Sequence, residues 1–164
     1  MEFFHVSLKP LKIDELFSVN DFEGEITYDH SKRPKEQQEI NLLLDKHRPE
    51  HCPSRIKCIY MFDNLETCAD YVKERNCHIY KVQAEKHWGP FPMRLVQELY
   101  KAQENKVQQI ITEYWQPQNQ WKVNEYITDE ILVIEECTID RLKAIAGQMQ
   151  YNCDDALARK IFST

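Results

Sequence analysis

The chain has 164 residues, of which 42% are hydrophobic and 29% are charged, and its formal net charge is −6. This length favours one domain that buries a core without disulfide or metal staples. The composition excludes a largely disordered chain, and the acidic balance argues against broad affinity for nucleic acid or for anionic membranes.

The N-terminus and the cysteines further bound the class of protein. No stretch approaches the ~20 apolar residues that a membrane span needs. The first residues, Met1 to His5, have neither the basic region nor the long apolar region of a secretory signal. The six cysteines include no C-x-x-C pair, which zinc ribbons and redox motifs use. We therefore expect a cytoplasmic protein with free thiols and no membrane partner.

Apolar periodicity and turn residues divide the first half of the chain into elements. The apolar run at the N-terminus predicts a strand, and the polar stretch after it predicts a long loop. Apolar residues between Leu65 and Val72 have the i, i+3, i+4, i+7 spacing of a helix, which Asp63 or Asn64 caps. In chain order we predict a strand over 3–8, a loop over 18–34, a helix from Pro34 to Arg48, a strand over 57–62, a helix over 63–76 and a strand over 78–84.

The second half of the chain gives the same kind of signal. A proline is favoured in the first turn of a helix, so Pro92 predicts a helix start. In chain order we predict a helix from Pro92 to Leu99, a helix over 107–114, strands over 121–127 and 130–135 joined by a turn at 128–129, a helix from Thr138 to Met149 and a short helix from Asp154.

The order of these elements indicates the fold class. Strands and helices are both present, but they do not alternate regularly as strand and long crossover helix. This favours an α+β domain over residues 1–164, with a mainly antiparallel sheet flanked by helices, over a doubly wound fold.

Three separated segments concentrate polar residues of unusual placement. The first is His5-Val6-Ser7 on the opening strand. The second is the pair Tyr60 and Tyr71, one on a strand and the other on the helix that follows. The third is Glu125 in the run Asn124-Glu125-Tyr126-Ile127, a carboxylate that enters an apolar strand. Each segment alone is common in proteins without a site.

Taken in order, the segments resemble the diphtheria-toxin-like and poly-ADP-ribose-polymerase-like branch of the ADP-ribosyltransferase superfamily. That branch has a histidine on an early strand, a tyrosine on a later strand, a second tyrosine on the following helix and a glutamate on a late strand. Here ten residues separate Tyr60 from Tyr71, as in that branch, and the run 124–127 is similar to the segment around the polymerases' catalytic glutamate. The resemblance spans residues 3–133 and implies a split antiparallel sheet.

Part of the chain also resembles small bacterial and phage domains of unassigned function that we associate with the same superfamily. The similar stretches are 53–71 and Tyr114-Trp115. A toxin or phage-conflict role would suit a small stand-alone transferase of this kind, and an antitoxin or inhibitor protein would then be a partner.

The resemblance implies an enzyme that transfers ADP-ribose from NAD⁺ to a macromolecular acceptor and releases nicotinamide. Two tyrosine faces can hold a cationic pyridinium through cation–π contact, and a carboxylate can stabilise the positive charge that develops on the ribose. We expect the histidine, both tyrosines and the glutamate to line one cleft. The implied catalytic residues are Glu125, His5 and Tyr60, and the implied NAD⁺ contacts are His5, Val6, Ser7, Tyr60 and Tyr71.

Arg55 precedes the Tyr60 strand, and its guanidinium fork suits a pyrophosphate. A surface ion pair explains the same residue equally well. We interpret Trp88, Trp115 and Trp121 as packing residues.

Two alternatives remain open. Val6 stands where the family has glycine, and Thr67 and Cys68 stand where the polymerase-like branch often has serines. These departures keep open a non-catalytic module of the same fold that binds a nucleotide or a partner. A metal-dependent hydrolase is the second alternative, because His47, Glu50, His51 and Cys52 form a dense cluster of metal-ligand types, although Pro49 breaks the helix that would align the histidines.

The acceptor is not identified by any residue pattern. Protein, nucleic acid and water all remain open. The basic runs 32–35 and 46–48 can guide an anionic acceptor, and they are equally typical of solvated loops.

Overall fold

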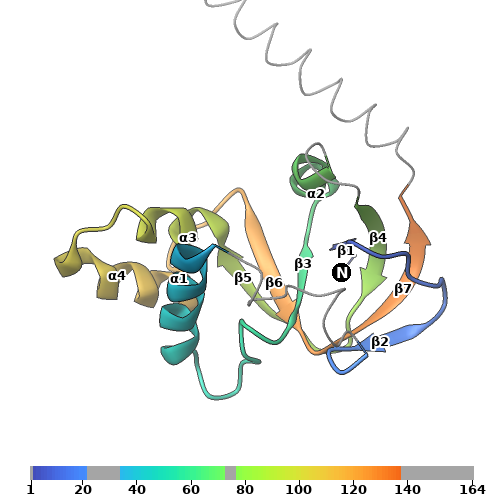
Figure 1. The fold of residues 1–164 in the computed structure, drawn as a ribbon, viewed down its shortest axis with the longest axis horizontal. Helices are drawn as coiled ribbons and strands as arrows, with labels where there is room; N and C mark the ends of the chain where they lie inside the picture. Colours follow the sequence, from blue (N-terminus) through green and yellow to red (C-terminus); the bar gives the residue numbers. More distant parts are fainter. Residues whose placement is uncertain (1, 22–33, 73–76, 138–164) are drawn as a thin grey trace, which may run out of the picture.

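The protein is described from a computed structural model, which covers residues 2–21, 34–72 and 77–137. Within these ranges the chain forms an α+β fold with seven strands and four helices (Figure 1). The elements are β1 (Phe3–Ser7), β2 (Leu16–Ser18), α1 (Lys35–Lys46), β3 (Ile59–Phe62), α2 (Leu65–Val72), β4 (His78–Gln83), β5 (Trp88–Pro92), α3 (Met93–Leu99), α4 (Glu104–Trp115), β6 (Asn124–Thr128) and β7 (Glu130–Glu136). The helices expected from Thr138 and from Asp154 lie outside the described residues.

Most elements match the sequence expectations to within a few residues, but two strands, β2 and β5, were not expected. β2 lies at the edge of the loop expected over 18–34, and β5 immediately precedes α3. The predicted cap of α2 is confirmed, because the Asn64 Oδ1 accepts a hydrogen bond from the Thr67 backbone N–H at 2.8 Å. None of the four described helices is long and apolar enough to cross a membrane.

The described strands form one antiparallel sheet in the order β2-β7-β4-β1-β3-β6-β5. The mainly antiparallel arrangement expected from the sequence is therefore confirmed. β1 pairs with β4 over five registered positions, whereas its pairing with β3 registers at one position, Phe4 opposite Phe62. At the centre of the sheet, β1 and β3 are thus joined by a short pairing, which we call the β1–β3 seam.

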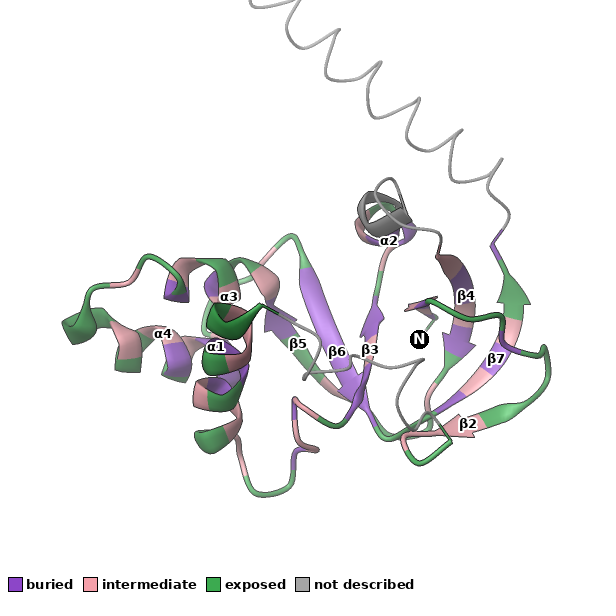
Figure 2. Ribbon diagram, in the orientation of Figure 1, coloured by how far each residue is buried: buried purple, intermediate pink, exposed green. Residues whose placement is uncertain are grey.

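Buried apolar residues lie on both faces of the sheet, and the four described helices pack on one of these faces. Helices α1, α3 and α4 gather beside β5 and β6, while α2 lies near β3 (Figure 1). One cluster joins these three helices to Phe91 and Ile127, and a second cluster on the other face contains Met61, Tyr80 and Tyr126. All five residues of β6 are buried as a result (Figure 2).

Gly89 in β5 is the one described glycine, and its backbone requires that residue type. Its φ is +130°, a conformation that L side chains rarely adopt. A Cβ there would lie 2.9 Å from the Tyr126 Cδ1. This close approach lets β5 pack directly against β6.

Candidate functional site

Arg55 lies on the segment between α1 and β3, and its backbone is tied to the chain on both sides. Its N–H donates to the Asp45 Oδ1 at 2.6 Å, and the same oxygen accepts from the Ser54 hydroxyl at 2.9 Å. Its carbonyl accepts from the Tyr60 hydroxyl at 2.6 Å and from the Cys58 thiol at 3.6 Å. These bonds fix the point from which the Arg55 side chain extends.

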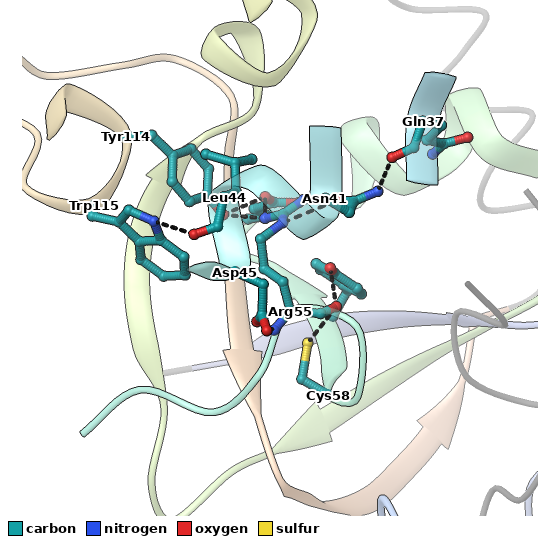
Figure 3. A network of polar contacts seen from close by, with 10 residues as sticks. Gln37, Asn41, Leu44, Asp45, Arg55, Cys58, Tyr114 and Trp115 are labelled. Carbon is teal, nitrogen blue, oxygen red and sulfur yellow. Dashed lines mark hydrogen bonds and ion pairs between the residues drawn. The ribbon is translucent and has the colours of Figure 1, made fainter. Parts of the chain in front are cut away.

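The Arg55 guanidinium is the centre of a buried polar network (Figure 3). Its Nε donates to the Asn41 Oδ1 at 3.1 Å, and its Nη1 donates to the Tyr114 hydroxyl and to the Glu125 carboxylate. The Tyr114 hydroxyl donates in turn to the Glu125 Oε1 at 2.7 Å. Side chains from α1, α4 and β6 therefore converge on one guanidinium.

The network is removed from water. Arg55 is 4% exposed, Glu125 is 5% exposed and Tyr114 is fully buried. Burial disfavours the charged guanidinium, but the Glu125 carboxylate and the Tyr114 hydroxyl outweigh it and raise the pKa of Arg55 well above its ordinary value. Burial also raises the pKa of Tyr114 well above its ordinary value, although Arg55 opposes that shift. The Arg55 guanidinium is thus charged, and the Tyr114 hydroxyl stays protonated.

Two aromatic rings flank the same cation. The Arg55 guanidinium carbon lies 5.2 Å from the centroid of the Tyr60 ring and 5.0 Å from that of the Tyr114 ring. These distances are within the range of cation–π attraction. The structure therefore brings together three sequence-predicted residues, Arg55, Tyr60 and Glu125, and adds Tyr114. A surface ion pair, which was the alternative for Arg55, is excluded because the pair is buried.

His5 is buried at the seam between β1 and β3. Its Nδ1 lies 2.8 Å from the Tyr60 carbonyl oxygen. A carbonyl only accepts, so Nδ1 carries the proton and donates it. Burial lowers the pKa of His5, and the bond to Tyr60 opposes this shift. A neutral histidine thus anchors the backbone of the residue whose side chain contacts Arg55.

The expectation that His5 and Glu125 line one cleft is wrong for the side chains in this structure. Phe4, Phe62 and Glu125 are register partners across β1, β3 and β6, so their side chains share a face. His5 follows Phe4 and is paired with Tyr80, which belongs to the core cluster on the other face. Side chains alternate along a strand, and this alternation separates the histidine from the glutamate.

The remaining implied NAD⁺ contacts are placed as follows. Val6 is half-buried and packs in the cluster between the sheet and α2. Ser7 is fully buried, and its hydroxyl donates to the Lys9 carbonyl at 2.7 Å, which closes a turn after β1. Tyr71 lies on α2, and its side chain is outside the described part of the structure.

The geometry of the described residues does not support the alternative of a metal-dependent hydrolase. Across residues 2–21, 34–72 and 77–137, no group of three or more His, Cys, Asp or Glu side chains could hold one metal ion. His47, a member of the suspected cluster, is exposed, and its Nδ1 lies 2.9 Å from the Leu43 carbonyl at the end of α1. The described cysteines form no disulfide.

Sequence reasoning missed Asn41 and Tyr114 as members of the polar network. Both stand among apolar residues on the buried faces of their helices, beside Ile40 and Leu44 in α1 and beside Ile111 in α4. A polar group on an apolar helix face needs a buried partner. That requirement is the signal that could have found them.

No protein-family model matches this sequence, and no curated protein matches it either.

Proposed function

We propose that the protein is an NAD⁺-dependent ADP-ribosyltransferase that transfers ADP-ribose to a protein or nucleic-acid acceptor. The observation that supports this best is the placement of His5, Tyr60 and Glu125 on β1, β3 and β6, which are consecutive strands of the sheet. Three distant segments thus lie on neighbouring strands in the order that the resemblance implies, with the Tyr60 and Glu125 side chains on one face of the sheet and the His5 side chain on the other.

The reaction is a substitution at C1′ of the nicotinamide ribose. The bond from C1′ to the pyridinium nitrogen breaks, and its electron pair leaves with neutral nicotinamide. A nucleophilic atom of the acceptor forms the new bond to C1′ and loses its proton to solvent or a base. The ribose gains positive charge on the way, so a carboxylate beside it stabilises the transition state more than the ground state.

The residues would divide this work between them. Glu125 would accept a hydrogen bond from the ribose 2′-hydroxyl and supply the negative charge. The rings of Tyr60 and Tyr71 would hold the pyridinium, and the Arg55 fork would bind the diphosphate. His5 would act through the Tyr60 carbonyl that it already binds, with the backbone at Val6 and Ser7 beside it.

A second candidate is a non-catalytic module of the same fold. The ion pair between Arg55 and Glu125 favours it, because a cation in contact with the carboxylate cancels the field that the reaction needs. Such a module would bind a nucleotide or a partner without releasing nicotinamide.

The two candidates are separated by turnover of NAD⁺. The full chain is mixed with NAD⁺ labelled in the adenylate part and with a whole-cell lysate, and free nicotinamide and transferred label are measured. The proposed enzyme releases nicotinamide, and Glu125→Gln lowers kcat by about 10²–10³ with a smaller effect on NAD⁺ affinity. Digestion of the labelled product with protease or with nuclease identifies the acceptor class.

The matched control is Glu98→Gln. Glu98 is also a glutamate bound to an arginine, but its partner Arg94 is exposed on α3. This variant keeps the wild-type rate. Nucleotide binding without nicotinamide release by the wild type would establish the second candidate.

A further inference from the structure

Arg55 is bound by the two groups whose release the proposed reaction requires. Its Nη1 is bonded to Glu125, and its guanidinium lies over the Tyr60 ring at 5.2 Å. The first contact neutralises the carboxylate, and the second occupies a ring face on which a pyridinium would stack.

We propose that Arg55 is a latch whose guanidinium exchanges the Glu125 carboxylate for the diphosphate of a dinucleotide. This inference rests on the proposed function and adds a regulatory step to the same site. Binding of the diphosphate releases Glu125 and uncovers Tyr60 in one movement. The carboxylate becomes reactive only when the diphosphate is present.

The Arg55 backbone is held in place, so such an exchange requires only movement of the side chain. Asp45 and Tyr60 hold its N–H and carbonyl at 2.6 Å each, so the guanidinium can move about the side-chain torsions while the main chain stays in place. The guanidinium donates to acceptor oxygens of Asn41, Tyr114 and Glu125. Phosphate oxygens are acceptors of the same kind and suit the guanidinium fork.

Charge gives the exchange its direction. Glu125 offers one negative charge in a site where it is 5% exposed. A diphosphate offers two charges and more acceptor oxygens, so it competes for the cation at close range. Glu125 keeps the Tyr114 hydroxyl as a donor at 2.7 Å after the cation leaves, so the released carboxylate retains a hydrogen-bond partner.

The latch predicts that Glu125 and a diphosphate compete, and calorimetric titration of the full chain with ADP-ribose tests this. Glu125→Gln removes the competing charge, so it should bind ADP-ribose about tenfold more tightly than the wild type. Arg55→Gln should lose most of the ADP-ribose affinity. Adenosine, which carries no phosphate, should bind both variants as it binds the wild type.

The matched controls are Glu98→Gln and Arg94→Gln, which alter an exposed pair of the same residue types on α3. Both should bind ADP-ribose with wild-type affinity. Where Glu125→Gln proves unfolded by circular dichroism, Asn41→Ala takes its place. It removes one acceptor from Arg55 and keeps the bond between Tyr114 and Glu125, so it should tighten ADP-ribose binding by a smaller factor in the same direction.

The latch is overturned if Glu125→Gln binds ADP-ribose no more tightly than the wild type, or if neither protein binds it. The titration needs no turnover. A protein that binds ADP-ribose in this pattern but releases no nicotinamide would keep the latch and disprove the enzyme. If the wild type releases nicotinamide, but the wild type and Glu125→Gln bind ADP-ribose with equal affinity, the latch is disproved and the enzyme is kept.

Discussion

Arg55 and Glu125 are separated by 70 positions in the chain and form an ion pair that is almost completely buried. Removing two charges from water is costly, and their attraction balances that cost only when further hydrogen bonds satisfy both groups. Asn41 and Tyr114 supply those bonds from α1 and α4. The polar network around this pair therefore links α1 and α4 to β6.

Loss of one partner should destabilise the protein strongly. We expect Arg55→Met to lower the free energy of unfolding by about 3–5 kcal/mol, because it leaves Glu125 as an uncompensated buried charge. Urea denaturation measures this value. The double variant with Glu125→Gln should recover part of the loss, and Arg94→Met, in an exposed pair, should cost ~0–1 kcal/mol. Equal losses in the two arginine variants would show that the buried pair contributes no more than a surface one.

The hydroxyl of Tyr114 should contribute to stability separately from its ring. The hydroxyl accepts from Arg55 and donates to Glu125, so Tyr114→Phe leaves two buried polar groups with one bond fewer. We expect a loss of about 1–3 kcal/mol in urea denaturation. Tyr100→Phe is the control, since Tyr100 is 36% exposed, and it should be nearly neutral. A neutral Tyr114→Phe would mean that the network does not need the bridging hydroxyl.

Leu44 should be the strongest single apolar contributor of α1. It is fully buried against the cluster that contains Trp115, whereas Leu42 on the same helix is 49% exposed. We expect Leu44→Ala to cost about 2–5 kcal/mol through lost burial and the cavity that it leaves. Leu42→Ala should change stability by less than about 0.5 kcal/mol. Similar losses for the two variants would contradict the packing of α1 against α4.

The elements that the sequence predicted are those with a clear apolar pattern. The strand from Ile59 is a short continuous apolar run, and three of its four residues are buried. The helix from Leu65 buries one helical stripe. Both patterns can be recognised in the sequence without the fold. β2 has three residues, and Leu16 in it is 59% exposed, so it has no apolar signal. β5 contains Gly89 and two prolines, which are typical of loops, and it is a strand because β6 pairs with it.

The candidate site could be predicted only in part. Glu125 and Tyr60 stood out as polar groups on apolar strands, and Arg55 stood out by its position before β3. Their contact joins residues that no sequence spacing relates, because it depends on the strand order and on the packing of α4. The face on which His5 lies depends on register, and a shift of one residue would reverse it.

His5 should make stability depend on pH in a defined direction. Burial lowers its pKa below the ordinary 6.5, so the unfolded chain binds a proton that the folded chain does not in the interval between the two pKa values. The free energy of unfolding should therefore fall as the pH drops below ~6.5, with a slope of up to ~1.4 kcal/mol per pH unit from this group. Above that pH the histidine is neutral in both forms and contributes no slope.

Comparison with His5→Gln isolates this contribution. Glutamine keeps an N–H that can donate to the Tyr60 carbonyl but does not titrate. Urea denaturation of both proteins between pH ~7.5 and ~5.5 should show that the wild type loses its advantage over His5→Gln as the pH falls. His51→Gln, which alters an exposed histidine, should keep the wild-type slope. Parallel curves for the wild type and His5→Gln would contradict this prediction. They would mean that His5 binds its proton equally well in the folded and the unfolded chain, whereas burial at the β1–β3 seam lowers the pKa of His5 only in the folded chain.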